Sequence, residues 1–411
     1  MVQAADKKIL RELAKQTAEV AALPVQEEKR ALWRALNGLK PVRPMVMIDQ
    51  VCWHEMDVAG ELALGCVSPE VRAYEQFLRR QLYQWRHFRV DQVVEPFIRV
   101  PLAIHNSGFG IQVEEEIAVG DAANDVVGHA YINQFARDED LKKIQMPVIR
   151  HDAAESERRL EQAREIFDGL LAVVPWGSDP YLSVWDPIST WMGVQDILYA
   201  LIDRPDFMLA LANRMVAGYM SQLDQLEAQG LLCHGQSLIH CTGAWTDELP
   251  ADGFDPNRPR TRDLWMFGLA QLFATVSPDM FETFEIETSL PLFARFGLVY
   301  YGCCDPLDRK MDAVRRIPNL RKVSMSPWVD EERGAAEIGS HYVFSRKPNP
   351  ALLAAPSFDD QAVRDHLARS VSVCRRHGCP MELILKDIST VKYEPQRLWR
   401  WAEIAMDVVQ S

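Results

Sequence analysis

The stretch FGLVYYGCCDPLD, residues 296–308, carries the strongest fold signal in this chain of 411 residues. Its first half is apolar and ends at Gly302, and two cysteines, an aspartate and a proline follow directly. Short apolar runs that are closed by turn residues are typical of buried strands. We therefore predict a buried strand whose end carries the thiols of Cys303 and Cys304 and the carboxylate of Asp305.

A second stretch, SLIHCTG at residues 237–243, has the same pattern. It predicts another strand, which ends in His240 and Cys241. Imidazoles and thiols are ligands for soft metal ions, and thiolates are nucleophiles. Two strands that end in such residues predict a functional site at one edge of a sheet or barrel.

Eight short apolar runs occur between residues 45 and 387, and helical patterns separate most of them. The runs lie at residues 45–48, 92–101, 170–177, 237–243, 296–304, 320–328, 341–350 and 381–387. Strands that alternate with helices predict an α/β fold, and eight of them favour a (β/α)8 TIM barrel. No glycine-rich phosphate loop of the Rossmann or Walker type follows any of these runs, which disfavours an open nucleotide-binding sheet.

The helical patterns define the rest of the chain. The clearest covers residues 205–229, with Asp203 as a candidate N-cap and Gly230 at the end. The periodic apolar residues at the start predict an N-terminal helical extension over residues 1–40. One barrel domain then covers residues 41–411, with residues 101–168 as a long insertion after the second strand.

Composition narrows the class of protein. The net charge of −13 argues against nonspecific nucleic-acid binding, which needs a basic surface. The N-terminus lacks the pattern of a signal peptide, and no run of eighteen apolar residues predicts a transmembrane helix. The eight cysteines show no disulfide framework of a secreted domain. We therefore expect a cytoplasmic protein with reduced thiols that binds neither nucleic acid nor a membrane.

In a TIM barrel, the residues at the carboxyl ends of the strands form the active site. The predicted strand ends of this chain are unusually polar for buried segments. The candidate catalytic residues are Glu95, Asp305, Lys386 and Asp387. The candidate substrate-binding residues are Asp49, Trp53, His54, Arg99, Trp176, Trp185, Ser324 and Arg346.

A zinc site is a further hypothesis, with His240, Cys303 and Cys304 as ligands. Zinc takes nitrogen and sulfur ligands, and catalytic zinc sites leave one position open. Adjacent residues on a strand point to opposite faces, so both cysteines face inward only if a turn begins there. The alternative is that one thiol of each cysteine-containing segment is buried as a small apolar side chain.

The candidate acids also have structural interpretations. Asp305 precedes a proline, so it is either a helix cap or a catalytic acid. Lys386 and Asp387 form either a structural ion pair or a pair that transfers protons and orients a polar substrate. Glu95 lies among apolar residues and is either a general acid or the partner of Arg99 or another cation.

The candidate binding residues have similar alternatives. Trp53 and His54 lie in the loop after the first strand, which either covers the barrel mouth or is ordinary surface. Trp176 and Trp185 form either the wall of a pocket for a flat group or ordinary packing. Arg346, together with the lysine after it, either grips a carboxylate or phosphate or is solvated.

Three segments resemble the uroporphyrinogen decarboxylase superfamily: LIHCTG at residues 238–243, VSPDMF at 276–281 and RFGLVYYGC at 295–303. The similarity covers the chain from about Pro41 onward. It implies a (β/α)8 barrel and one of two activities, the decarboxylation of porphyrinogens or the corrinoid-dependent methyl transfer of anaerobes.

Two departures from the superfamily patterns bear on that choice. The decarboxylases open with an arginine-rich segment, whereas the matching residues 44–56 here contain no arginine. Porphyrinogen decarboxylation is therefore disfavoured. The thiol-directed methyltransferases bind zinc through His-x-Cys and a distant cysteine near the last strand. Here His240 matches the first ligand, but Thr242 replaces the second, and Lys386 and Asp387 lie where the third is expected.

The resemblance thus favours the demethylating component of a corrinoid-dependent methyltransferase. It implies a small methylated donor, an ether (as for an O-demethylase) or an amine, and a separate corrinoid protein that docks over the barrel mouth and supplies cobalamin. Zinc remains a candidate metal, and the family allows a homodimer. The alternative is a decarboxylase or lyase of the same family that acts on a small carboxylic acid. A noncatalytic corrinoid carrier is disfavoured, because the chain lacks the Asp-x-His-x-x-Gly signature.

Overall fold

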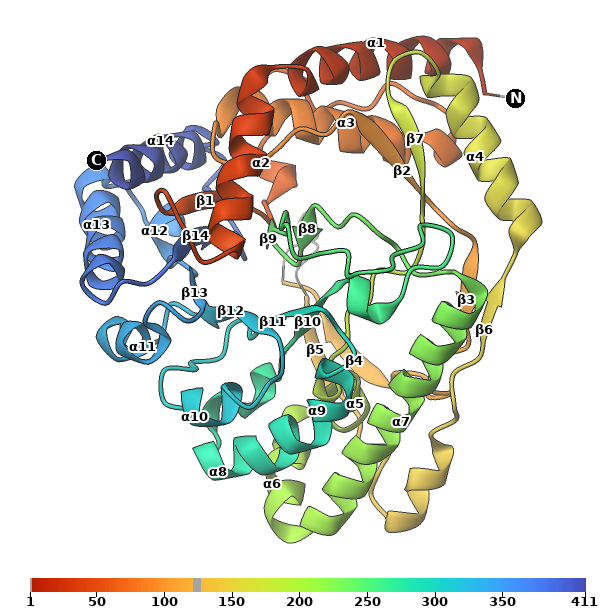
Figure 1. Ribbon diagram of the computed structural model, residues 1–411, viewed down its shortest axis with the longest axis vertical. Coiled ribbons are helices and arrows are strands. Elements are labelled where there is room, and N and C mark those ends of the chain that lie inside the picture. Colours follow the sequence, from red (N-terminus) through yellow and green to blue (C-terminus); the bar gives the residue numbers. More distant parts are fainter. Residues whose placement is uncertain (1, 121–126) are drawn as a thin grey trace.

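The computed structural model describes residues 2–120 and 127–411 and shows an α/β fold (Figure 1). Its centre is a six-stranded parallel sheet in the order β1-β14-β13-β12-β11-β10. These strands are β1 (Met45–Ile48), β10 (Trp265–Gly268), β11 (Leu298–Tyr301), β12 (Leu320–Met325), β13 (Val343–Arg346) and β14 (Met381–Leu385). Every residue of β1, β10, β11, β13 and β14 is buried, which is typical of a parallel sheet covered on both faces.

A second parallel pair lies opposite this sheet, across the middle of the molecule (Figure 1). It consists of β2 (Phe97–Pro101) and β7 (Ala172–Trp176). An isolated bridge between Tyr181 and Phe267 connects the chain beyond β7 with β10. The arrangement of the two sheets is consistent with a TIM-barrel-like fold.

The helices lie mainly outside the strands (Figure 1). They are α1 (Ala4–Ala21), α2 (Pro24–Asn37), α3 (Pro69–His87), α4 (Ala153–Phe167), α5 (Trp185–Met192), α6 (Val194–Asp203), α7 (Pro205–Gln229), α8 (Pro278–Phe281), α9 (Glu287–Phe293), α10 (Met311–Val314), α11 (Glu331–Ile338), α12 (Ala351–Ala354), α13 (Asp360–Arg376) and α14 (Gln396–Gln410). The predicted helix at residues 205–229 is confirmed as α7. Its predicted cap is wrong, because Asp203 is the last residue of α6 and Arg204 precedes α7 without a side-chain cap.

Seven of the eight predicted strands are present, and the exception is the stretch at residues 237–243. It forms a short antiparallel hairpin of β8 (Leu238–Ile239) and β9 (Thr242–Gly243), with His240 and Cys241 as its turn. His240 has the left-handed φ of 51° that such a turn requires. The sequence lacks the Asn-Gly or Asp-Gly signal of a hairpin, so the turn reads as part of an apolar run. The position in the parallel sheet that was predicted for residues 237–243 is occupied by β10 instead.

The predicted insertion after the second strand is also present but shorter than expected. It contains the antiparallel pairs β3 (Ile104–Asn106) with β6 (Ile149–His151), and β4 (Glu115–Ala118) with β5 (Gly128–Tyr131). The helix α4 follows and packs against both β2 and β7, so it belongs to the regular alternation of strands and helices.

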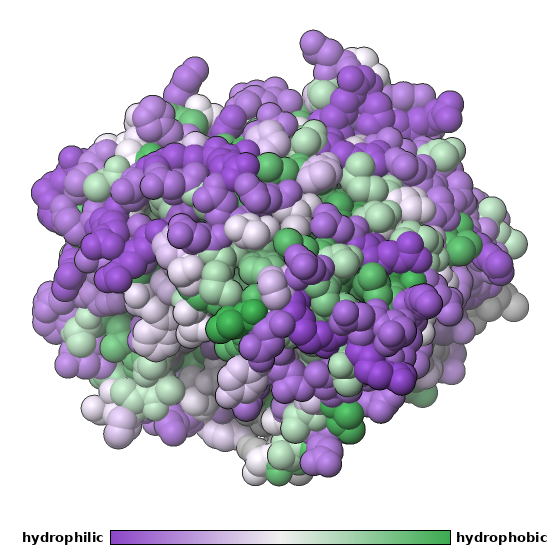
Figure 2. All heavy atoms as spheres, turned by 90° about the horizontal axis from the view of Figure 1, so that it is seen from below, coloured by the Kyte–Doolittle hydropathy of each residue, from purple (hydrophilic) through white to green (hydrophobic). Residues whose placement is uncertain are grey.

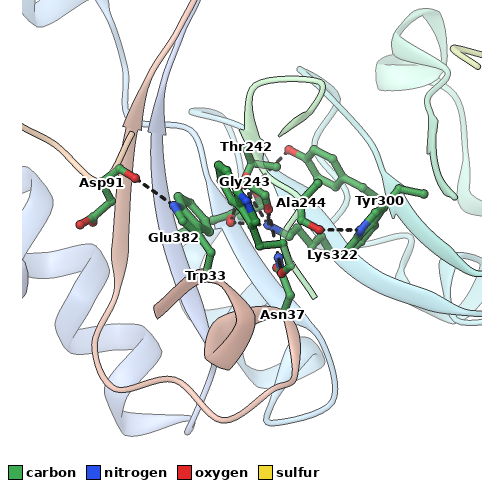
Figure 3. Close-up of polar contacts among 12 residues, drawn as sticks. Trp33, Asn37, Asp91, Thr242, Gly243, Ala244, Tyr300, Lys322 and Glu382 are labelled. Atoms are coloured by element: carbon green, nitrogen blue, oxygen red, sulfur yellow. Dashed lines mark hydrogen bonds and ion pairs between the residues drawn. The ribbon is translucent and has the colours of Figure 1, made fainter. Parts of the chain in front are cut away.

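Helix α2 of the N-terminal extension packs against the β8–β9 hairpin. Trp33 of α2 is fully buried, and its indole Nε1 donates to the backbone oxygen of Asp91 at 2.9 Å (Figure 3). A Cβ on Gly243 would lie 2.4 Å from the Trp33 ring, so only glycine allows this approach. Asn37 of α2 donates to the backbone oxygens of Gly243 and Trp245 at 3.0 and 2.7 Å. The hairpin and α2 are therefore fixed to each other.

Hydrophilic side chains cover most of the face shown in Figure 2, and apolar side chains lie among them. Within residues 2–120 and 127–411, no helix is both long enough and apolar enough to cross a membrane.

Candidate functional site

Three segments bring polar side chains together at the carboxyl ends of the parallel strands. Cys303 and Cys304 follow β11, Lys386 and Asp387 follow β14, and His240 is in the turn of the β8–β9 hairpin. The Sγ of Cys303 lies 3.0 Å from the Nζ of Lys386, 3.6 Å from the Sγ of Cys304 and 3.7 Å from the Nε2 of His240. We call these five residues the thiol cluster.

Both cysteines face this cluster because the strand ends before them. Gly302 has a φ of 91°, a conformation that favours glycine, and a Cβ there would lie 2.5 Å from the Cδ1 of Leu307. Two hydrogen bonds hold the turn: Ser324 Oγ donates to the Cys303 oxygen at 2.6 Å, and the Cys303 N–H donates to Asp305 Oδ1 at 3.1 Å. The predicted condition for two inward-facing thiols, a turn that begins at the cysteines, is met.

The electrostatics of the cluster favour a thiolate at Cys303. Hydrogen bonding by Cys304 lowers the pKa of Cys303 most, and His240 and Lys386 lower it further against the effect of burial. The same contact raises the pKa of Cys304, which remains a neutral thiol. Burial lowers the pKa of Lys386, but the contacts with Cys303 and Asp387 outweigh this and raise it, so the lysine is an ammonium ion.

We expect this thiolate to be measurable by ultraviolet thiolate absorbance in a pH titration. Because the folded pKa of Cys303 is lowered, its thiolate should persist as the pH falls well below the range of a free cysteine, about 8.5. The difference between the wild type and Cys303→Ser isolates its contribution from the other seven cysteines. A difference spectrum that titrates at the free-cysteine pKa would contradict the assignment.

Two carboxylates contribute to the charge of this region, that of Asp387 within the thiol cluster and that of Asp49 beside it. The Oδ2 of Asp387 lies 2.9 Å from Lys386 Nζ and accepts from Cys304 Sγ at 3.4 Å. Burial raises the pKa of Asp49, which follows β1, although His240 and Lys386 lower it. Asp387 and Gln50 both have left-handed φ values, 56° and 48°. Non-glycine residues in this conformation are often found at functional sites.

Two cavities open beside these strand ends. One, of about 560 Å³, is lined by Asp49, Arg99 and several aromatic side chains. The other, of about 870 Å³, is lined by His54 and Asp387 among others. Trp53 and Arg80 line both cavities, so Trp53 lies in the wall between them. We call the smaller one the aromatic cavity, and its size suits a small organic ligand.

Several predicted site residues surround the aromatic cavity. Arg99 donates to Ser237 Oγ at 2.6 Å, and its guanidinium carbon lies 4.0 Å from the centre of the Trp176 ring. Glu95 lines the cavity and pairs with Arg30 at 3.1 Å. The glutamate is therefore the partner of a cation, the alternative role predicted for it, although the cation is Arg30 rather than Arg99.

Other predicted site residues have structural positions. Trp185 is fully buried in the core against Phe273, so the predicted pocket wall is a packing contact. Arg346 points toward the outer helices and pairs with Glu331 at 2.5 Å, so it does not present a charge to the site. Asp305 is buried behind the turn that it stabilises, and α10 begins only at Met311, so it is not a helix cap. The alternation of side chains along a strand does not by itself show whether a residue at the strand end points into the site or away from it.

The zinc hypothesis does not fit the cluster as it stands. Among residues 2–120 and 127–411, no three His, Cys, Asp or Glu side chains are placed to hold one metal ion. The ammonium of Lys386 lies 3.0 and 3.7 Å from the two thiols, where a cation bound by both would have to lie. Zinc therefore stays a prediction, and no chemistry is assigned to it.

A buried ion pair, which sequence reasoning missed, lies deeper between the sheets. Lys322 of β12 donates to Glu382 Oε2 of β14 at 2.8 Å, and both side chains are fully buried (Figure 3). Thr242 and Ser345 donate to the same carboxylate at 2.7 and 2.6 Å. Lys322 also donates to Thr242 Oγ1 and to the Gly243 oxygen. Both residues are charged and lie inside predicted strands, and this was the signal in the sequence from which the ion pair could have been predicted.

Comparison with known proteins identifies a structural likeness. No protein-family model matches the sequence, and no curated protein matches it with significant sequence similarity. A solved structure of a methyltransferase from Methanosarcina mazei superposes with a TM-score of 0.50 and 13% identity. The match covers 92% of this chain and 97% of the other. At this identity the likeness concerns the fold, and it extends over nearly the whole of both chains.

Proposed function

We propose that this protein is the demethylating component of a corrinoid-dependent methyltransferase in the uroporphyrinogen decarboxylase superfamily. It would move a methyl group from a small methylated donor to a Co(I) corrinoid on a separate protein. The thiol cluster beside a ligand-sized cavity carries the proposal. Support also comes from the methyltransferase whose structure resembles this one over nearly its whole length. The proposal includes closure of the eight parallel strands into one (β/α)8 barrel.

The surface around the strand ends supports a docked partner. Tyr181, Trp328 and Tyr393 follow β7, β12 and β14 and are 52%, 72% and 64% exposed. Exposed aromatic side chains are enriched at protein interfaces. The corrinoid protein would cover this rim. All eight cysteines are free, which agrees with a reducing cytoplasm.

In this proposal, residues of the chain position the donor and supply one proton to the leaving group. A Co(I) corrinoid supplies the nucleophile that accepts the methyl group. The donor lies in the aromatic cavity with its methylated heteroatom near Asp49. When the carbon–heteroatom bond breaks, its electron pair stays on the heteroatom, which takes the proton of the Asp49 carboxyl. Burial, by raising the pKa of Asp49, favours the protonated form that this step needs.

Lys386 would assist the same step without giving up its proton. Its ammonium is held by Cys303 and Asp387, and it lies within electrostatic reach of Asp49. A fixed positive charge stabilises the negative charge that develops on the leaving heteroatom. The Cys303 thiolate, in this proposal, keeps the lysine charged and oriented.

The test is a spectroscopic assay with free cob(I)alamin and a panel of methyl ethers and methylamines. We expect donor-dependent conversion of cob(I)alamin to methylcobalamin, with formation of the demethylated product in equal amount. Mass spectrometry of the product and a no-enzyme control identify the reaction. Absence of conversion over the panel, also with corrinoid proteins added, would refute the proposal.

A decarboxylase that acts on a small carboxylic acid is the second candidate, because two arginines line the aromatic cavity. The same incubations with carboxylic acids, analysed for released CO2, test it. Release of CO2 without methyl transfer would replace the first proposal with this one.

A further inference from the structure

Two sulfur atoms of the thiol cluster lie in contact without a covalent bond. The Sγ atoms of Cys303 and Cys304 are 3.6 Å apart, and both thiols are free. We call these two residues the cysteine pair. The turn at Gly302 creates this contact, because neighbouring residues of an undistorted strand point to opposite faces. A disulfide of about 2.0 Å would require the two sulfurs to approach each other by about 1.6 Å.

The two members of the cysteine pair differ in chemical state. The ammonium of Lys386 lies 3.0 Å from the Cys303 sulfur, and the Nε2 of His240 lies 3.7 Å from it. Both contacts favour a thiolate at Cys303. The Cys304 thiol donates to the Oδ2 of Asp387 at 3.4 Å, so it keeps its proton. A thiolate next to a second, neutral thiol is the arrangement in which an oxidised cysteine is resolved to a disulfide.

The cysteine pair lies at the edge of the larger cavity. Cys303 is only 3% exposed, whereas Cys304 is half-buried. The side chain of Asp387, which contacts Cys304, is 49% exposed and lines the cavity of about 870 Å³. An oxidant therefore approaches the pair from this cavity, and the burial of Cys303 favours one as small as a peroxide.

A disulfide between chain neighbours is a strained bond. Adjacent Cα atoms are about 3.8 Å apart across a trans peptide, whereas the Cα atoms of ordinary disulfides are at least about 4.4 Å apart. Strain makes a disulfide easier to reduce. The bond formed by the cysteine pair would therefore be reversible in a reducing environment, as a regulatory disulfide must be and a structural one is not.

We infer that the cysteine pair is a modification site at which a peroxide forms a disulfide between Cys303 and Cys304. The Cys303 thiolate first attacks one peroxide oxygen, the O–O bond breaks, and the leaving oxygen takes a proton from solvent. Cys303 is then a sulfenic acid. The Cys304 sulfur attacks the Cys303 sulfur, the S–O bond breaks, and the hydroxyl group leaves as water with the Cys304 proton. The two sulfurs have lost two electrons, and the peroxide has gained them.

The disulfide would change the charge around Lys386. The lysine loses the thiolate at 3.0 Å and keeps only the carboxylate of Asp387 at 2.9 Å. If the proposed function holds, on which only this consequence rests, oxidation stops methyl transfer, because the thiolate no longer orients the ammonium. A thiol reductant would restore both the thiolate and the activity.

The test is mass spectrometry of the full-length reduced protein after brief treatment with hydrogen peroxide, alkylation in denaturant and digestion with trypsin. Residues 296–309 form one tryptic peptide, which contains the cysteine pair and no other cysteine. We expect this peptide to lose two hydrogen atoms, to resist alkylation and to recover after reduction with dithiothreitol. Cys66 is the internal control, because burial raises its pKa to about 12 and keeps it a neutral thiol. The cysteine pair should be oxidised at least tenfold faster than Cys66.

Variants assign the role of each thiol. Cys304→Ser should stop the reaction at a sulfenic acid on Cys303, which dimedone traps. Cys303→Ser should leave Cys304 reduced. Cys379→Ser is the matched control and should react as the wild type does, because Cys379 precedes β14 and Lys386 follows it. Thermal melts establish that each variant is folded.

Several outcomes would overturn the inference. One is a peptide 296–309 that stays open to alkylation, or that is oxidised no faster than Cys66. Another is resistance to peroxide that disappears when a chelator removes a metal. A full rate of methyl transfer by the oxidised protein would overturn the regulatory consequence. Reversible oxidation of a protein that transfers no methyl group in either state would reject the proposed function and leave the modification site standing.

Discussion

Replacing Lys322 with methionine is expected to lower the free energy of unfolding by about 3 to 5 kcal/mol, as the loss of one partner of a buried ion pair does. The methionine leaves the Glu382 carboxylate fully buried without its cation. Thr242 and Ser345 would still donate to that carboxylate, but they carry no charge. Urea denaturation followed by fluorescence or circular dichroism measures the change.

The double variant Lys322→Met/Glu382→Leu distinguishes the effect on stability of removing the whole ion pair from the effect of removing one partner. Replacing both charges by apolar side chains of similar size is often neutral, so most of the lost stability should return. Lys142→Met, at an exposed position, should stay within about 0.5 kcal/mol of the wild type. A single Lys322→Met variant as stable as the wild type would show that Glu382 is not a buried charge.

Replacing Lys386 with methionine is expected to lower the rate of methyl transfer roughly 100- to 1000-fold, the usual cost of removing one group that stabilises developing charge. The same change removes the cation 3.0 Å from Cys303. The pKa of Cys303 should therefore rise toward its ordinary value. Stopped-flow measurement of cob(I)alamin consumption and the thiolate titration record the two effects.

Lys8→Met is the matched control, because Lys8 is exposed on α1 and far in sequence from the cluster. Circular dichroism must show that the Lys386→Met variant is folded. A full rate in folded Lys386→Met would remove the lysine from the proposed mechanism. A lost rate with an unchanged Cys303 titration would instead separate the lysine's action from that of the thiolate.

The thiol cluster shows why adjacent cysteines need not be a metal site. In an undistorted strand, Cys303 and Cys304 would point to opposite faces. The turn at Gly302 removes this restriction and brings the two sulfurs to 3.6 Å. The neighbour supplied by β14 is then an ammonium ion, so a positive charge already stabilises the thiolate.

Residue pattern alone was sufficient to predict seven of the eight parallel strands and their polar ends, whereas β10 was missed. Seven predicted strands are present, and Cys303, Lys386, Asp387 and His240 do meet. Apolar runs closed by turn residues determine where strands end, and parallel strands end on one side. The class of fold and the location of the thiol cluster therefore follow from the sequence.

The direction and pairing of the side chains depended on tertiary structure. Arg346 turns outward to Glu331, whereas Arg80, which no pattern singled out, lines the aromatic cavity. Pairing of charges decides these roles, because an arginine that finds a carboxylate is structural and one that finds none is available to a ligand. The partners come from segments far apart in the chain, as Lys322 and Glu382 do across 60 residues. Sequence thus determined which chemical groups reach the strand ends, and only the packing of the chain decided which of them remain free to act.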